Sequence, residues 1–290
     1  VRSAALRGGF HEVVLHHDHD LTRTLHYAEL VSTPGVELRP MHLAQLFEAC
    51  APFAAGLADL YARLRTPATR SDLVRFALLY SQGGVYLDMD TVTLRPLEPL
   101  CRNASAFCGE ERIVYPAHVR NSLDPWVRLL ALTRSHLRTS CRLLPRGWAT
   151  FRRLEQLYPL AANPAVLASA PRSTFVTQAL TRMLAIPRRK QPLPNVIGPH
   201  LLQHLLADPG RGSVVVHPAE AFFPLPPEIS CHWFRDGTYQ DLAQIVSPDT
   251  RVVHWYASGR NKHLTSIIDP TYVRCNAERQ LFSKLALPFT

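Results

Sequence analysis

The stretch SDLVRFALLYSQGGVYLDMDTVTLRP, residues 71–96, decides the fold of this chain. Apolar residues recur at helical spacing in its first part, which predicts a helix over residues 71–81. Asp72 and Arg75 are three positions apart, so they share one side of that helix, opposite its apolar stripe. The pair Gly83-Gly84 follows directly and is typical of the sharp turn that ends a helix.

Two carboxylates come next and are the strongest sign of chemistry in the chain. The short apolar strand expected at residues 85–87 leads to Asp88 and Asp90, two alternate residues at its end. Carboxylates gathered at a strand end are costly unless something positive holds them. A divalent cation with oxygen ligands, itself bound to a diphosphate, is the simplest way to satisfy both. The pattern therefore predicts a metal site that binds a diphosphate.

The residues before this stretch continue an alternation of strands and helices. The pattern predicts a strand at 10–15, a helix at 21–30, a strand at 36–38, and helical residues at 43–64 with a break at Pro52. This order is typical of an α/β fold with a mostly parallel sheet and helices on both faces. Such sheets bind ligands beyond the carboxyl ends of their strands, where the acidic clusters at 18–20 and 88–90 both fall.

The same residues carry a resemblance to a known family. Residues 71–96 resemble the sugar-transfer region of the Asp-x-Asp glycosyltransferases, of the capsular-polysaccharide and α-1,4-glycosyltransferase type (glycosyltransferase family 32-like). The residues that match the family pattern in order are Ser71, Asp72, Arg75, Leu79, Tyr80, Gly83, Gly84, Tyr86, Asp88 and Asp90. Weaker similarities to the family extend over most of the chain, at 163–171, 197–202, 222–224 and 253–255.

The resemblance implies a GT-A-type nucleotide-sugar fold, built on a Rossmann-like sheet, in a single domain over residues 1–290. Residues 115–158 have no counterpart in the family pattern. This segment has eight arginines, two acidic residues and an apolar face, so we expect a basic helical insertion with a solvated arginine face. Two alternatives are a patch for an anionic membrane and a docking surface for a lipid-diphosphate or acidic-glycan acceptor.

The resemblance also implies a donor site. Asp88 would contact the ribose or the sugar, and Asp90 would bind Mn²⁺ or Mg²⁺ that bridges the diphosphate of a nucleotide sugar, expected to be a UDP-sugar. Asp72 and Arg75 would hold sugar hydroxyls or phosphates. Each of these last two also has a local interpretation, because Asp72 suits the first turn of a helix and Arg75 could form a structural ion pair.

Other residues complete the expected site. Tyr86 is a candidate donor-binding residue, although it also suits the core. His254 is a candidate ligand of the metal or the phosphates, or else a buried, hydrogen-bonded histidine. Lys262 and Arg260 follow it closely and would balance the diphosphate charge, unless they are ordinary surface charges.

Together these features predict a metal-dependent glycosyltransferase of the hexosyltransferase class, acting in polysaccharide or glycolipid synthesis. The acceptor would be a glycan or glycolipid, and the family implies retention of the anomeric configuration. One alternative is a toxin-like enzyme that modifies a protein side chain. A basic nucleic-acid-binding protein is disfavoured, because few aromatic residues lie among the arginines and the Asp pair would repel phosphate, so we expect no nucleic-acid partner.

The composition is that of a folded protein, with 47% hydrophobic and 19% charged residues among 290, which excludes a disordered or fibrous chain. The net charge of +9 suits a phosphorylated ligand, an anionic membrane or nucleic acid equally. No apolar run reaches the roughly 20 residues of a membrane span, and the six cysteines form no C-x-x-C pair, so we expect reduced thiols. We expect a bacterial cytoplasmic location with peripheral membrane contact through residues 115–158. A glycosylation sequence at Asn103 leaves the Golgi lumen as the alternative.

Overall fold

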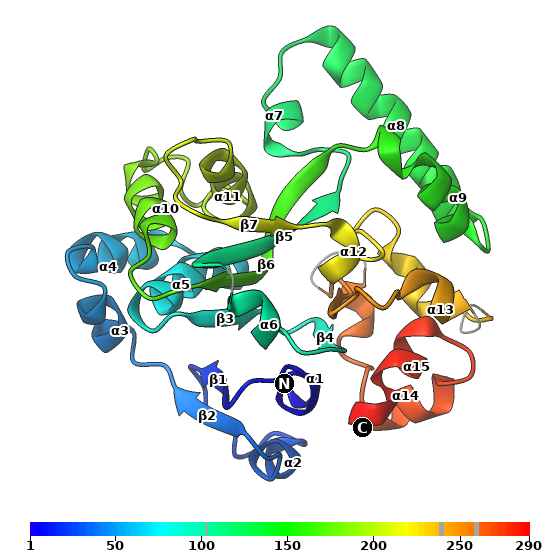
Figure 1. Ribbon diagram of the computed structural model, residues 1–290, viewed down its shortest axis with the longest axis horizontal. Coiled ribbons are helices and arrows are strands. Elements are labelled where there is room, and N and C mark those ends of the chain that lie inside the picture. Colours follow the sequence, from blue (N-terminus) through cyan, green and yellow to red (C-terminus); the bar gives the residue numbers. More distant parts are fainter. Residues whose placement is uncertain (103, 238–240, 258–260) are drawn as a thin grey trace. The chain divides into compact units, whose positions relative to one another are not determined.

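The computed structural model describes residues 1–102, 104–237, 241–257 and 261–290 (Figure 1). Its contacts divide the chain into two units. The first unit consists of Val1–Leu87, Pro96–Gly109 and Ala162–His217, and the second of Asp88–Arg95, Glu110–Ala161 and Pro218–Thr290. The single domain expected over residues 1–290 stays a prediction.

The first unit combines helices with strands in two sheets. Its helices are α1 (Arg2–Arg7), α2 (Tyr27–Val31), α3 (Leu43–Ala49), α4 (Ala54–Arg63), α5 (Pro67–Ser81), α6 (Glu98–Cys101), α10 (Thr174–Ala185) and α11 (Pro199–Leu206). Its strands are β1 (Val13–His17), β2 (Val36–Pro40), β3 (Gly84–Leu87), β7 (Val215–His217), and the larger parts of β5 (Ala106–Arg112) and β6 (Leu160–Ser169).

The strand pairings confirm the expected α/β class and correct one detail of it. β1 and β2 are parallel, and in the sheet of order β3-β6-β5-β7 the pair β5–β7 is also parallel. β3, however, runs antiparallel to β6, with Gly84 opposite Ser169. The sheet is therefore mixed rather than mostly parallel. Two strands joined directly by a crossover helix run parallel. The connection from β3 to β6 is long and varied, so it does not fix the relative direction of these two strands.

Local signals place α5 and the turn after it. The helix begins at Pro67, because the Thr66 hydroxyl accepts a hydrogen bond from the Thr69 N–H at 3.3 Å and proline suits the first helical position. The turn at its end needs glycine, since Gly83 and Gly84 have φ of +71° and +99°. A Cβ on Gly83 would also lie 2.6 Å from the Pro171 ring. The predicted helix and turn are thus confirmed, with the helix four residues longer at its start.

The core of the first unit lies between its longer helices. Side chains from α4, α5, α10 and α11 are almost fully buried there, namely Leu57, Leu60, Leu73, Phe76, Phe175, Leu180 and Leu202. Burying each contributes roughly 1.5–3 kcal/mol. The break expected at Pro52 separates α3 from α4. The helix expected at 21–30 is shorter, since Asp20 accepts from the Thr22 N–H at 2.9 Å and forms a turn where the helix was expected to begin.

The second unit is largely helical. Its strands are β4 (Thr91–Thr93) and β8 (Val252–His254), which pair antiparallel. Its helices are α7 (Ala117–Arg120), α8 (Pro125–Leu143), α9 (Gly147–Leu154), η1 (Glu155–Leu157), α12 (Ala219–Phe222), η2 (Ser230–Phe234), α13 (Leu242–Ile245), η4 (Lys262–Leu264), α14 (Pro270–Asn276), α15 (Leu281–Ala286) and η5 (Leu287–Phe289). A core of aromatic residues joins them, with Trp148, Phe151, Tyr158, Trp233 and Phe282 buried.

Residues 115–158 are helical, as predicted. The prediction that their arginines form a solvated face is wrong for α8. Arg138 and Arg142 are turned toward Glu228, with N–O distances of 2.9 and 3.3 Å. Several leucines of α8 are exposed instead. Ion pairing to a distant carboxylate therefore outweighs the usual orientation of a basic amphipathic helix.

All six cysteines are free. Among the described residues, no helix combines the length and the apolar composition needed to cross a membrane.

Candidate functional site

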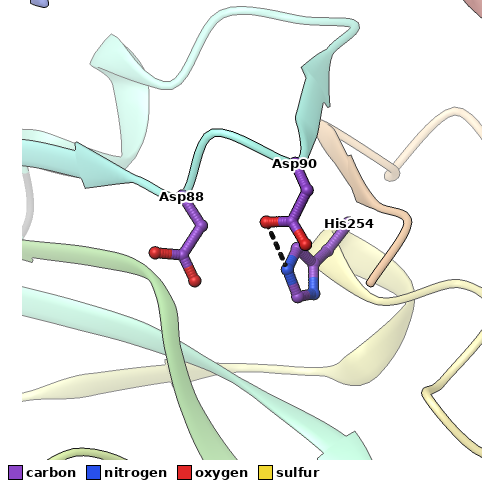
Figure 2. Close-up of side chains that lie close together, drawn as sticks. All are labelled: Asp88, Asp90 and His254. Carbon is purple, nitrogen blue, oxygen red and sulfur yellow. Dashed lines mark hydrogen bonds and ion pairs between the residues drawn. The ribbon is translucent and has the colours of Figure 1, made fainter. Parts of the chain in front are cut away.

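The turn between β3 and β4 carries the two carboxylates of the Asp-x-Asp motif. β3 ends at Leu87 and β4 begins at Thr91, so Asp88 and Asp90 flank a single residue, Met89. The Thr91 hydroxyl donates to the Asp88 carbonyl oxygen at 2.7 Å and closes the turn. Figure 2 shows the two carboxylates pointing to the same side of the turn. The alternate spacing of the motif therefore brings two acidic groups together.

His254 reaches this turn because β8 pairs with β4. Thr91 lies opposite His254 in the pair, so the imidazole is next to Asp90 although the residues are far apart in sequence. The His254 Nε2 and Asp90 Oδ1 atoms are 3.0 Å apart (Figure 2). The main chain strengthens the link, since the N–H of Trp255 donates to the carbonyl oxygen of Asp90 at 3.0 Å.

The Asp90 carboxylate is held at both of its oxygens. Oδ1 is bound to His254, and Oδ2 accepts a hydrogen bond from the Ala257 N–H at 2.7 Å. Its side chain is 14% exposed, and that of His254 is 8% exposed. A carboxylate fixed in this way is oriented before any ligand arrives, and its oxygens have further lone pairs for a metal.

The three side chains form a plausible donor set for a cation. One ligand atom from each of Asp88, Asp90 and His254 lies within 4.8 Å of the others. Carboxylate oxygens suit Mg²⁺, Ca²⁺ and Mn²⁺, whereas imidazole nitrogen is a ligand of transition metals. The chemistry of this donor set, two carboxylates and one imidazole, therefore fits a divalent cation.

The charges at the turn shift the pKa values of both His254 and Asp90. Burial lowers the pKa of His254, but the hydrogen bond and charge of Asp90, with the charges of Asp88 and Glu111, outweigh it and raise the pKa above its ordinary value. Burial raises the pKa of Asp90, but its bonds to His254 and Ala257 outweigh burial and lower that pKa. Each group of the pair therefore favours the charged form of the other, which raises the pKa of His254 and lowers that of Asp90.

Tyr256 and Glu111 support the site and were not predicted from the sequence. The Tyr256 hydroxyl donates to Glu111 Oε2 at 2.6 Å, and both residues are buried. The Tyr256 ring lies against the His254 ring, with centroids 4.1 Å apart. Burial first, and then Glu111, raise the pKa of Tyr256, so its hydroxyl keeps its proton. Tyr256 directly follows the segment 253–255, and Glu111 ends an apolar strand, which are the signals that could have indicated them.

Tyr256 also has a backbone conformation that is uncommon for a residue with a side chain, with φ of 57°. The next residue is Ala257, whose N–H donates to Asp90. The left-handed turn at Tyr256 thus directs a main-chain donor to the motif. Backbone conformations of this kind persist where surrounding contacts hold them, here the bond to Glu111.

The other expected donor residues, Asp72, Arg75 and Tyr86, lie together in the first unit. Arg75 and Asp72 form an ion pair at 3.4 Å, with side chains 6% and 11% exposed. The guanidinium also donates to the Pro164 carbonyl oxygen at 2.6 Å and lies 4.5 Å from the centroid of the Tyr86 ring. The Tyr86 hydroxyl is 3.0 Å from the Ser71 hydroxyl. The ion pair left open as an alternative for Arg75 is therefore present.

Gly198 makes room for the Asp72 carboxylate. A Cβ at Gly198 would lie 2.3 Å from that carboxylate, which no side chain tolerates. Gly198 is also the residue before α11, and it belongs to the segment 197–202 in which the weaker similarity to the family was noted. The sequence elements 71–75 and 197–202 therefore meet in one buried cluster.

Lys262 lies in η4 and is exposed. Its role at the diphosphate stays a prediction. Arg260 and Asn103 lie outside the described residues.

The comparison with protein families identifies the N-terminal part of the chain. Residues 12–107, about a third of the 290 residues, match the model described as the glycosyltransferase sugar-binding region containing DXD motif. This region belongs to the DXD glycosyltransferases. The match includes Asp72, Arg75, Tyr86 and the Asp88–Asp90 turn, and it confirms the predicted DXD glycosyltransferase family.

A solved structure is also similar to this chain, namely the ligand-free glycosyltransferase domain from the YGT toxin. The two share 14% identity over 66% of this chain and 54% of that one, with a TM-score of 0.34. The chain therefore spans about half the length of that structure. No curated protein matches the chain.

Proposed function

We propose that this glycosyltransferase moves a sugar from a nucleotide-diphosphate donor, a UDP-sugar, to a glycan or glycolipid acceptor, with a divalent cation held by Asp88, Asp90 and His254. The observation that carries the proposal is the convergence of these three side chains, whose ligand atoms lie within 4.8 Å of one another. The imidazole in the set favours Mn²⁺ over Mg²⁺, because nitrogen ligands suit a transition metal better.

A cation bound there would neutralise the negative charge that develops on the leaving nucleoside diphosphate. The chain itself contributes orientation. Asp90 is fixed by His254 and the Ala257 N–H, so little freedom is lost when a ligand binds. Asp88 presents its carboxylate on the same side of the turn (Figure 2), where we propose that it contacts the ribose or sugar of the donor.

In the proposed transfer, the bond between the anomeric carbon of the sugar and the diphosphate oxygen breaks. A new bond forms between that carbon and an acceptor hydroxyl oxygen, whose proton is lost. We propose retention of the anomeric configuration, as the family resemblance implies, and we assign no nucleophile. The contacts expected of Arg75 and Asp72 with sugar hydroxyls or phosphates stay predictions, and their buried ion pair would hold this part of α5 in one conformation.

Ligand-induced thermal stabilisation tests this proposal. The protein is heated with a panel of nucleoside diphosphates and nucleotide sugars, with and without Mn²⁺. A ligand present at about 100 times its Kd stabilises the native state by roughly 2.7 kcal/mol, which is readily measured. We expect stabilisation by uridine nucleotides that requires Mn²⁺ and is lost in Asp90→Asn.

Asp249→Asn is the matched control, because Asp249 is an exposed aspartate of the same unit. It should keep the full stabilisation. If no nucleotide stabilises the wild-type protein at any Mn²⁺ concentration, the proposed donor site is wrong. Stabilisation that persists in Asp90→Asn would instead place the nucleotide at a different site and overturn the metal assignment.

A further inference from the structure

Helix α8 exposes an unusual amount of apolar side chain to solvent. Leu123, just before the helix, is 84% exposed, and Trp126 is 77% exposed. Leu129, Leu130 and Leu132 are each about half exposed, at 53%, 48% and 53%. Single exposed leucines are ordinary, but contiguous apolar patches on soluble proteins mark interaction sites. These residues are here called the α8 face.

The positions along the helix show that three of these side chains gather on one side. Trp126, Leu129 and Leu130 have the spacing i, i+3, i+4, which places them on a common face. Ala131, Arg138 and Arg142 follow the spacing i, i+7, i+11 and lie on the opposite side, where Ala131 and Arg142 are buried. The helix therefore has Arg138 and Arg142 on its inward side and Trp126, Leu129 and Leu130 on its outward side.

Ionic contacts explain this inverted orientation. Glu228 accepts from Arg138 at 2.9 Å and from Arg142 at 3.3 Å, and its other oxygen accepts from the Val114 N–H at 2.8 Å. His232 adds a hydrogen bond to the Cys141 carbonyl oxygen at 3.0 Å, near the end of the helix. These contacts set the rotation of α8, so the α8 face cannot turn inward without breaking a buried ion pair.

The charges around the α8 face have one predominant sign. Arg120, Arg128 and His136 are exposed. The exposed acid in this stretch, Asp124, is used locally, since it caps α8 by accepting from the Trp126 N–H at 2.8 Å. An apolar surface accompanied by exposed arginines in the same stretch complements an anionic lipid surface, into which leucine and tryptophan insert while guanidinium groups meet phosphates.

We propose that the α8 face docks on an anionic lipid bilayer, with the helix lying in the interface. The described helices include none that could span a membrane, so the contact is peripheral. The proposal does not depend on the sugar donor. It assigns the apolar side of the insertion, rather than its arginine side, to the lipid.

Vesicle sedimentation tests the proposal on the full chain. One set of vesicles is phosphatidylcholine alone, and the other contains about one-third phosphatidylserine. We expect binding to the anionic vesicles that falls by roughly tenfold or more in the double variant Leu129→Glu, Leu130→Glu. Arg120→Glu with Arg128→Glu should lower binding to anionic vesicles and make it less sensitive to salt.

The control is Leu287→Glu, a comparably exposed leucine of the second unit outside the α8 face. It should bind vesicles like the wild type. Trp126 gives a second readout, because Trp148 and Trp233 are buried and Trp255 is half-buried. Its emission should shift to shorter wavelength on anionic vesicles, and Trp126→Phe should remove the shift.

Nucleotide-induced stabilisation, measured in parallel, should be the same in all these variants, which keeps the outcome separate from the proposed donor site. The proposal is wrong if the wild type ignores anionic vesicles, or if the double leucine variant binds them equally well. A concentration-dependent dimer that the double variant abolishes, without vesicle binding, would show that a second copy covers the face and would also overturn the proposal.

Discussion

Two buried charge clusters of the second unit are built in opposite proportions. At the Asp88–Asp90 turn, two carboxylates meet one imidazole, that of His254. Beside α8, two guanidinium groups, those of Arg138 and Arg142, meet the single carboxylate of Glu228. The first cluster therefore has an excess of negative charge and the second an excess of positive charge.

The difference separates a ligand site from a structural tie. Neutral acceptors satisfy some of the surplus guanidinium N–H groups, as when Arg142 donates to the Glu228 carbonyl oxygen and Arg138 donates to the Ser135 hydroxyl at 2.6 Å. Surplus carboxylates need positive charge, which a metal supplies most compactly. Removing charge should therefore destabilise the α8 cluster but mainly impair ligand binding at the turn.

The largest effect on stability is expected for Glu228→Gln. It leaves Arg138 and Arg142 buried without a carboxylate, and breaking one side of a buried ion pair costs about 3–5 kcal/mol. Urea unfolding of the protein at neutral pH measures the loss. Asp249→Asn is the control, and an equal change in both variants would contradict the structural role of Glu228.

Asp90→Asn should impair sugar transfer strongly and should lower the stability less than Glu228→Gln does. The amide oxygen still accepts one of the two hydrogen bonds and the other is lost, so the free energy of unfolding without metal should fall by about 1–3 kcal/mol. Sugar transfer should fall by roughly 10²–10³-fold, because charge on the leaving group is no longer stabilised. Radiolabelled transfer assays and urea unfolding provide the two numbers. A large loss of stability with normal sugar transfer would show that the cluster at the Asp88–Asp90 turn is a structural tie, like the cluster around Glu228.

The α8 side should also respond to pH through His232. Burial lowers the pKa of His232 to about 4, so it is neutral in the folded protein below its ordinary pKa. In the unfolded chain it takes up a proton near pH 6.5, so its contribution to stability is complete above that pH and is lost as the pH falls toward 4. Urea unfolding should show a loss of about 2 kcal/mol from this group between roughly pH 7 and pH 5.

His232→Gln is the control for that experiment, because glutamine does not titrate. The difference between wild type and variant isolates the histidine from the other ionisable groups. Identical pH slopes in the two proteins would show that His232 does not keep its low pKa.

The smallest effect concerns the support of the turn. Tyr256→Phe removes the hydroxyl that donates to the buried Glu111, which should cost about 1–3 kcal/mol because the acceptor is charged. Tyr272→Phe is the matched variant, since the Tyr272 hydroxyl donates to a neutral acceptor, Gln280, at 3.0 Å. Its cost should be about 0.5–1.5 kcal/mol. Chemical unfolding of both variants makes the comparison, and a smaller loss for Tyr256→Phe would contradict the role given to Glu111.

Features that depend on near neighbours in the chain could be predicted. The helix at 71–81, the turn at Gly83-Gly84 and the strand before Asp88 all follow from apolar spacing and from the special conformations of glycine. The break at Pro52 is of the same kind. The antiparallel entry of β3 next to β6 could not be predicted, because strand direction depends on a connection that leaves the sheet and returns.

The residues of the candidate site also fall into those that could be predicted from the sequence and those that could not. Asp88 and Asp90 were identified from their spacing, and the resemblance added His254. The support from Tyr256 and Glu111 was missed, because it needs a left-handed tyrosine and a contact between residues far apart in sequence.

The sequence by itself determined the family, the helices and turns, and the pair of carboxylates, because each depends on residues close together in the chain. The tertiary structure decided what those parts face. The pairing of β4 with β8 brings His254 to Asp90. The carboxylate of Glu228 holds Arg138 and Arg142 of α8 on the inward side, and several leucines of the helix are exposed. An amphipathic pattern states only that a helix has two different faces, and a buried charge from a distant segment selected which one packs inward.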